Sequence, residues 1–271
     1  MPEPYAFLKG HGTENDFVLL PDHDGTVHGD LSADRVRALC DRRAGIGGDG
    51  VLRVVRREGR WFMDYRNADG SIAEMCGNGI RVFARYLLEA GLVDPTAPIE
   101  VDTRDGLKVV RVDGDQITAD LGTPRVLGDT VVGVGATSWP AQHVDMGNPH
   151  AVAFVDSLDP HGPVGPLLDP PSRDPERFPD GVNVEFVVRR GERHVAMRVH
   201  ERGSGETRSC GTGACAVMVA AALADDARPS GSDVAYRVDV PGGTLTVTWT
   251  TDDRVLLTGP AVIVARGTTA L

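Results

Sequence analysis

The amino-acid sequence predicts an α+β fold made of two similar halves, each a set of mostly antiparallel strands around one central helix. The first observation is a repeat: Cys-Gly-Asn-Gly at residues 76–79 recurs about half a chain length later as Cys-Gly-Thr-Gly at residues 210–213. The second is that each motif opens onto an apolar stretch of helical character. The third is that alternating apolar segments bounded by turn residues, typical of antiparallel strands, fill the remainder.

Length and turn composition divide the chain between these halves. A chain of 271 residues is long enough for two domains of ordinary size. The turn residues Gly122-Thr123-Pro124 mark the boundary. We therefore predict a first half at residues 1–122 and a second at residues 123–260.

Composition excludes several classes of protein. The net charge of −11 argues against binding to a phosphate backbone, so a small-molecule partner is predicted, with no nucleic acid and no membrane. Lysine occurs only as Lys9 and Lys108, which disfavours a pyridoxal phosphate enzyme. The cysteines form no CxxC pair and no signal segment precedes them, so a reducing cytoplasm is the expected location.

The first half begins with strands and has its central helix after Cys76. Arg81, Arg85 and Glu89 recur at a spacing of four, which predicts one solvent-facing side for that helix, and Gly91 should end it. Ser32 is the expected N-cap of an earlier helix. The predicted elements are strands 5–9 and 18–20, helix 32–40, strands 51–55 and 60–65, helix 80–91, and strands 99–103, 107–113 and 116–121.

The second half repeats this plan around a helix at residues 214–224. That stretch has no charged residue, so protein must enclose it, which places Cys210 at the N-terminus of a buried helix. The proline-rich residues 156–180 are predicted to be a surface connection. The predicted strands are 131–134, 141–144, 151–155, 181–188, 193–199, 234–240, 244–249, 255–258 and 261–265.

Two thiols at two helix N-termini suggest acid–base chemistry. The helix dipole should lower the pKa of each thiol, and the unpaired N–H groups of the first turn should bind a carboxylate, which the glycines would allow to approach closely. One thiolate could then remove an α-proton while the opposite thiol delivers one, as in a two-base racemase. Glu201, and His150 in an Asn-Pro-His turn, could each polarise a thiol.

Other interpretations of these residues remain open. A cysteine before an apolar helix is often a buried small side chain, and Cys40 and Cys215, which lack the repeated frame, are assigned to the core. Metal binding by Cys76, Cys210 and His150 lacks ligand pairs close in sequence, so no metal is predicted. His150 alone could be structural. The glycines at residues 45–50 are a weak phosphate signal, and Asn15-Asp16 could be a self-capping turn.

Several motifs, in this order along nearly the whole chain, resemble the diaminopimelate epimerase family. The resemblance implies two pseudo-symmetric halves, each a sheet curled on a central helix, with the active site between them and the last strand, within residues 261–271, returning to the first half. It also implies conversion of LL- to meso-diaminopimelate without a cofactor, for lysine and peptidoglycan synthesis. The motifs are Asn15-Asp16-Phe17, Asn67-Ala68-Asp69-Gly70-Ser71, Glu74-Met75-Cys76-Gly77-Asn78-Gly79, Met146-Gly147-Asn148-Pro149-His150, Gly181-Val182-Asn183-Val184-Glu185-Phe186, Glu201-Arg202-Gly203 and Cys210-Gly211-Thr212-Gly213-Ala214.

The resemblance also implies roles for individual residues. Cys76 and Cys210 would be the acid–base pair, with His150 and Glu201 tuning the thiols. The residues implied to hold the reacting carboxylate are Gly77, Asn78, Gly211 and Thr212. Those implied to contact the nearby amino group are Asn67 and Glu201, and those implied to fix the distal end are Asn15, Asn148, Asn183 and Arg202.

Three positions depart from the family pattern, and two rival functions stay open. Gly50 stands where many members have a glutamine that touches substrate, Glu14 replaces a frequent glycine, and His200 a frequent aromatic residue. A proline racemase-like epimerase on the same fold is one rival. A thiol redox protein is the other, although the missing CxxC counts against it. For the assembly, a homodimer is the expectation.

Overall fold

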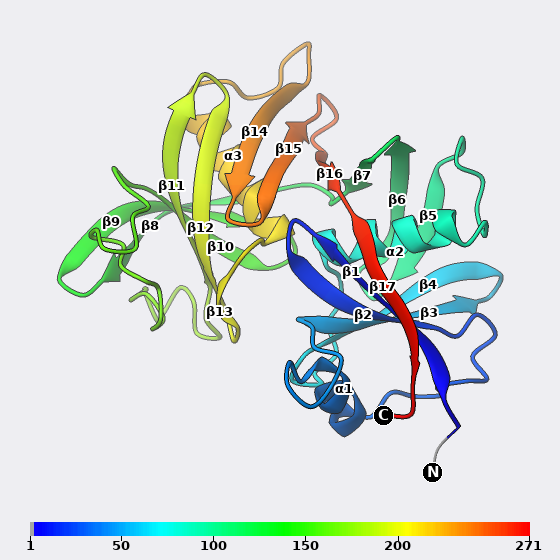
Figure 1. The fold of residues 1–271 in the computed structure, drawn as a ribbon. Helices are drawn as coiled ribbons and strands as arrows, with labels where there is room; N and C mark the ends of the chain where they lie inside the picture. Colours follow the sequence, from blue (N-terminus) through cyan, green and yellow to red (C-terminus); the bar gives the residue numbers. More distant parts are fainter. Residues whose placement is uncertain (1–2) are drawn as a thin grey trace. The chain divides into compact units, whose positions relative to one another are not determined.

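The computed structural model describes residues 3–271, which divide into two compact units. The first unit runs as far as Ala119 and is completed by residues 259–271, and the second comprises residues 120–258. Figure 1 shows the strands and the central helix of each unit.

The first unit builds its sheet from the strands of the N-terminal part of the chain and the last strand. Residues 116–120 end this run at the unit boundary. Its elements are β1 (Tyr5–Gly12), β2 (Asn15–Pro21), α1 (Ala33–Cys40), β3 (Gly50–Arg57), β4 (Arg60–Asn67), α2 (Gly77–Glu89), β5 (Ile99–Thr103), β6 (Gly106–Asp113), β7 (Gln116–Asp120) and β17 (Val262–Thr269).

The second unit has one long helix among its strands. Its last strand crosses the unit boundary at residue 259. Its elements are β8 (Arg125–Val134), β9 (Thr137–Asp145), β10 (Pro149–Phe154), β11 (Asn183–Gly191), β12 (His194–Glu201), β13 (Gly205–Thr207), α3 (Gly211–Ala224), β14 (Val234–Val240), β15 (Gly243–Trp249) and β16 (Val255–Pro260).

The two units share one order of strand pairing. In the first, β17, β1, β2, β3, β4, β5, β6 and β7 are successive neighbours, with β2–β3 and β4–β5 parallel and the other pairs antiparallel. In the second, β8, β9, β10, β11, β12, β14, β15 and β16 repeat that sequence of directions. In both units the central helix comes after the fifth strand of this order, β4 in the first unit and β12 in the second. The predicted α+β fold with a duplicated, mostly antiparallel sheet is confirmed.

Each sheet curls around its central helix. Helix α2 packs against β1, β2, β3, β4 and β17, and α3 packs against β9, β10, β11, β12, β14 and β15. Nearly every residue of α3 is buried, as the absence of charge predicted. None of the helices within residues 3–271 has the length and apolar character needed to cross a membrane.

The solvent-facing side predicted for α2 is wrong at one residue. Glu89 is exposed, but Arg81 is fully buried. Its guanidinium donates to the side-chain oxygen of Asn78 at 3.0 Å and passes so close to Gly12 that a Cβ there would lie 3.0 Å from Nη2. A buried arginine inside a hydrogen-bond network leaves no trace in the spacing of charged residues.

Local signals were accurate at the first helix and incomplete in the proline-rich segment. The side chain of Ser32 accepts from the Arg35 N–H at 3.3 Å, which confirms it as the N-cap of α1. Residues 156–180, predicted to be a surface connection, instead send Val164, Leu167 and Phe178 into the core of the second unit. In chain order this segment lies between the parallel strands β10 and β11, as α1 lies between the matching parallel strands β2 and β3 of the first unit.

The β1–β2 hairpin explains why Glu14 is unusual. Gly12 pairs with Asn15, so Thr13 and Glu14 alone make the turn, and both have positive φ, 49° and 62°. Two-residue turns of this kind favour glycine at the second position, because a side chain in the left-handed region is strained. Glu14 therefore holds a conformation that glycine would adopt without strain.

Replacing Glu14 with glycine should stabilise the protein. We expect Glu14→Gly to raise the free energy of unfolding by about 0.5–1 kcal/mol, because the relief of left-handed strain exceeds the extra backbone entropy of glycine. Urea titration followed by circular dichroism measures this. Glu100→Gly, at an exposed position in β5, is the matched control and should destabilise. Equal destabilisation by both changes would show that Glu14 is unstrained.

Candidate functional site

Both cysteines of the repeated motif are helix N-caps, one in each unit. Cys76 precedes α2 and Cys210 precedes α3, and each has extended backbone angles. The sulfur of Cys76 accepts from the Gly79 N–H at 3.4 Å, and that of Cys210 from the Gly213 N–H at 3.3 Å. Each sulfur thus takes the place that a serine or aspartate oxygen usually has at an N-cap.

The second glycine of each motif is required by packing beneath the helix. A Cβ on Gly79 would lie 3.3 Å from Cys76 Cβ and 3.3 Å from Leu52 Cδ2, with Phe17 Cζ at 3.6 Å. A Cβ on Gly213 would lie 2.7 Å from Glu185 Oε1 and 3.2 Å from the sulfur of Cys210. These two glycines therefore let the first helical turn settle on the strands, a reason that the sequence prediction of close carboxylate approach did not include.

In the first unit, Asn15 connects Cys76 to a group of charged side chains. Its Oδ1 lies 3.7 Å from the Cys76 sulfur and accepts from Asn78 Nδ2 at 3.1 Å. Its own NH₂ group donates to Asp49 Oδ2 at 2.7 Å. Since a carboxylate can only accept from this amide, Asp49 fixes the orientation of Asn15 and turns its oxygen toward the thiol.

Asp49 belongs to an ion cluster formed by Lys9, Asp16, Arg42 and Asp49. Arg42 donates to Asp16 at 2.7 Å and to Asp49 at 2.7 Å, and Lys9 pairs with Asp16 at 2.5 Å. Although burial opposes it, hydrogen bonds and charge from Arg42 and Lys9 hold the pKa of Asp16 below its usual range. Burial and the Asp16 charge raise the pKa of Asp49. Asp16 therefore serves this cluster and not a self-capping turn.

In the second unit, His150 lies in a buried network with Glu185 and Asn148. His150 Nδ1 is 2.7 Å from Glu185 Oε1, and His150 Nε2 is 3.0 Å from Asn148 Oδ1. The side chains of His150 and Glu185 are both fully buried. Because Glu185 Oε1 and the Cys210 sulfur both lie next to Gly213, this network is a near neighbour of the thiol.

The lowered pKa predicted for the thiols is wrong for Cys210. Burial raises the pKa of Cys210, and the charges of Glu201 and Glu185 raise it further, while hydrogen bonds from Thr212 and the Gly213 N–H oppose the change. The N-terminus of α3 does supply donors, but complete burial next to two carboxylates outweighs them. Cys210 is accordingly a thiol that holds its proton, the form needed in a proton donor.

The remaining candidates lie at the ends of matching strands. Asn183, first in β11, accepts from the Arg202 N–H at 2.9 Å and donates to the Pro149 carbonyl at 3.3 Å. Glu201, last in β12, accepts from the Thr207 hydroxyl. Asn67, last in β4, donates to Ser71 Oγ at 3.0 Å. Asn183 thus connects the backbone of Arg202 to the carbonyl of Pro149, the residue before His150.

Sequence reasoning missed three contributors to these sites: Asp49, Arg81 and Glu185. Asp49 stands among glycines and resembles an ordinary turn residue. Glu185 alternates with Asn183 on one face of an otherwise apolar strand, which was the available signal. Cys40 and Cys215 are buried, as predicted.

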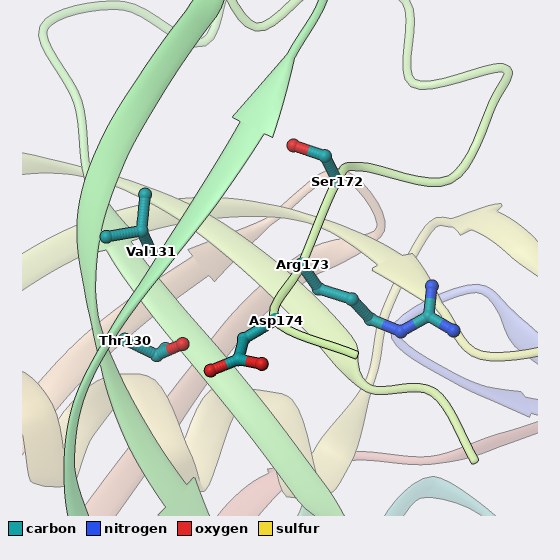
Figure 2. A pocket seen from close by; sticks show the side chains of 5 residues that line it. All are labelled: Thr130, Val131, Ser172, Arg173 and Asp174. Atoms are coloured by element: carbon teal, nitrogen blue, oxygen red, sulfur yellow. The ribbon is translucent and has the colours of Figure 1, made fainter. Parts of the chain in front are cut away.

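Other features of the described residues do not add to these sites. A pocket of 390 Å³ in the second unit is lined by Thr130, Val131, Ser172, Arg173 and Asp174, and in Figure 2 the Arg173 side chain points away from Thr130. None of its lining residues belongs to the networks around the cysteines. Within residues 3–271, no group of three His, Cys, Asp or Glu side chains is arranged to hold a metal ion.

Two departures from the family pattern have structural explanations. A Cβ on Gly50 would lie 2.5 Å from the Arg66 carbonyl oxygen and 2.7 Å from Tyr65 Cε2, so this backbone has no room for the glutamine that the family resemblance implied. His200 is buried, and burial lowers its pKa, so it packs as a neutral ring where the family resemblance implied an aromatic residue.

Comparisons with known proteins cover almost the whole chain. A family model described as diaminopimelate epimerase matches residues 7–127 and 142–264. A diaminopimelate epimerase of Streptomyces coelicolor is 58% identical, with 97% of this chain and 94% of that protein covered. A PhzF-family phenazine biosynthesis protein of Bacillus anthracis has 15% identity and a TM-score of 0.74, covering 98% of this chain and 99% of its own. A hydroxyproline epimerase of Agrobacterium vitis has 16% identity and a TM-score of 0.65, and the match covers 100% of this chain and 94% of that protein. These solved structures have the predicted fold.

Introducing the glutamine at position 50 should harm the protein. We expect Gly50→Gln to lower the free energy of unfolding by about 2–3 kcal/mol, because its Cβ would overlap a backbone carbonyl that is held in the β3–β4 ladder. Gly191→Gln is the matched control, since a Cβ there meets nothing within 4 Å. Chemical denaturation of both variants measures the difference. A Gly50→Gln protein as stable as the control would refute the overlap.

Proposed function

We propose that this chain, which belongs to the diaminopimelate epimerase family as its motifs predicted, converts LL-2,6-diaminopimelate to meso-diaminopimelate. The family model covers most of the chain, and the Streptomyces relative shares more than half of its residues. The protein is thus an isomerase acting on a small molecule, in the route to lysine and peptidoglycan precursors. No cofactor has a part in this proposal.

The observation that carries the proposal is the pair of cysteine-capped helices at equivalent positions of a duplicated fold. Each cap places a sulfur beside the N–H groups of a first helical turn. Donors at a helix N-terminus stabilise a carboxylate, and stabilise it more as the α-carbon loses its proton and charge moves onto the oxygens. A thiol next to such donors can therefore act on the α-carbon of the amino acid that they bind.

The reaction needs one thiolate and one thiol. The thiolate takes the α-proton and becomes S–H, the carbanion charge spreads into the carboxylate, and the other thiol gives its proton to the opposite face and becomes the thiolate. The raised pKa of Cys210 favours its protonated form. The direction of the reaction in which Cys210 donates the proton therefore starts from the form that Cys210 has before substrate binds. Cys76 is then the base in that direction.

The other site residues complete the proposal by their positions in the family motifs. Gly77, Asn78, Gly211 and Thr212 form the first turns after the cysteines and would hold the reacting carboxylate. Asn67 and Glu201 would contact the nearby amino group, and His150 and Glu201 would tune the thiols. The residues proposed to fix the distal amino acid end are Asn15, Asn148, Asn183 and Arg202. Arg202 suits a carboxylate there.

Two rival functions are tested by substrate. A proline racemase-like epimerase shares the fold, but a ring amino acid without a second charged end would leave Arg202 and the asparagines unused. A thiol redox protein is disfavoured because the cysteines form no CxxC pair. We propose a cytoplasmic location, which would keep both thiols reduced. We also propose a homodimer, supported by the exposed apolar side chains of Val126, Leu127 and Val131 on β8.

The substrate and the thiols can be tested together. The reduced protein should convert LL-diaminopimelate to a mixture with the meso isomer, without added cofactor, and should leave L-proline unchanged. Chiral chromatography of the products measures both. Conversion of proline but not diaminopimelate would establish the rival epimerase, and turnover of neither would remove the epimerase proposal.

Removing either sulfur should abolish inversion. Cys76→Ala and Cys210→Ala are each expected to lower kcat by at least about 10³-fold, because each removes one of two obligatory proton-transfer groups. Cys40→Ala is the matched control, since that thiol is buried in a different core. Substantial inversion by either single variant would contradict a mechanism with two thiols.

A further inference from the structure

The two units differ in the residues on which their cysteine-capped helices rest. The parallel pair β2–β3 of the first unit begins with Phe17 opposite Gly50, and the matching pair β10–β11 of the second begins with His150 opposite Asn183. Phe17 therefore matches His150. Two residues further along β3 and β11, Leu52 matches Glu185. The apolar pair Phe17 and Leu52 under Gly79 is therefore replaced, under Gly213, by a pair that can carry charge.

The hydrogen bonds of His150 define how many protons this pair holds. Asn148 Oδ1 can only accept, so Nε2 of His150 carries a proton. One more proton lies between Nδ1 and Glu185 Oε1, whichever atom it is bound to. The pair as a whole is then neutral, which suits two fully buried side chains better than a buried net negative charge. The other carboxylate oxygen, Oε2, makes no hydrogen bond within residues 3–271.

The same register makes Asn148 the counterpart of Asn15, and the two amides are anchored by opposite ends. Asp49 accepts from the NH₂ group of Asn15, which turns the Asn15 oxygen to the Cys76 thiol. His150 donates to the oxygen of Asn148, which leaves the Asn148 NH₂ group as a donor. Equivalent asparagines thus present an acceptor in one unit and a donor in the other.

We propose that Glu185 is a positioning residue which, through His150, fixes the Asn148 amide so that its NH₂ group donates to a substrate carboxylate. The inference rests on the proposed function for the identity of the ligand. Without the Glu185 carboxylate, neutral His150 could carry its proton on Nδ1, and the Asn148 amide could then rotate and present its oxygen, which repels a carboxylate. Two titratable groups face this pair, Cys210 at the N-cap of α3 and His143 of β9, and Glu201 of β12 faces Cys210 in turn.

The proton arrangement can be measured without substrate. Protein labelled with ¹⁵N at histidine should show, at pH 8, one ring with a proton on Nε2 and a shared proton at Nδ1. His150→Phe should remove that ring from the spectrum and so assign it. An Nδ1–H ring with an unprotonated Nε2 would overturn the proposal. Because no turnover is involved, this result is independent of whether diaminopimelate is the substrate.

Kinetics of two variants separate positioning from packing. Glu185→Leu, which copies the first unit, should raise KM about tenfold or more, the size expected for losing one hydrogen bond to a charged group. Glu185→Gln should keep KM within about threefold, because its amide can donate to Nδ1 and so preserve the Nε2 proton. Equal KM values for Glu185→Leu and the unaltered protein, or equal defects in both variants, would overturn the proposal.

A second histidine–carboxylate pair gives the matched control. His194 Nε2 lies 2.6 Å from Asp239 Oδ2 in the same unit, partly exposed and outside the His150 network. Asp239→Asn should leave KM unchanged. If Glu185→Leu does not fold, the double variant His150→Phe with Glu185→Leu reproduces the apolar pair of the first unit. It should fold and show the same rise in KM, and an unchanged KM would count against the proposal.

Discussion

The missing side chain at the second glycine of each cysteine motif is the constraint on which the sites depend. At Gly79 and Gly213 the first helical turn lies against the underlying strands so closely that a Cβ would meet the cysteine itself and a strand side chain. That contact fixes the helix, and the fixed helix gives the sulfur its backbone donor. The glycine thus determines where the thiol lies before any ligand is bound.

Duplication kept this geometry and changed its chemical surroundings. The pairing order, the central helix and the capping sulfur are common to both units, because each is a property of backbone and register. The side chains beneath the helix are not: Phe17 and Leu52 make the first support apolar, while His150 and Glu185 bring a buried ionisable pair close to Cys210. The two thiols therefore have different electrostatic environments, which suits a reaction in which one begins as base and the other as acid.

Local patterns in the sequence were sufficient for the elements and for the cysteines. Ser32 and the run without charges after Cys210 depend on neighbours in sequence, so helix α1 and buried helix α3 could be predicted. Arg81, Phe178 and the raised pKa of Cys210 could not, because each depends on what packs against it from a distant segment. Glu185 was visible as a polar residue in an apolar strand, but its partner His150 is brought to it only by the parallel pairing of β10 and β11.

The central claim of the proposed function is that two cysteine sulfurs, one a thiolate and the other a thiol, transfer protons at opposite faces of one carbon. The most direct measurement is the first turnover of LL-diaminopimelate in D₂O, with deuterium at the α-carbon followed in product and recovered substrate by mass spectrometry. Because a thiol carries a single proton, the delivered atom must come from the second, solvent-equilibrated sulfur. The account predicts deuterium at the inverted carbon of the product and none in the recovered substrate. Product that retains the original proton, or substrate labelled before product forms, would contradict it.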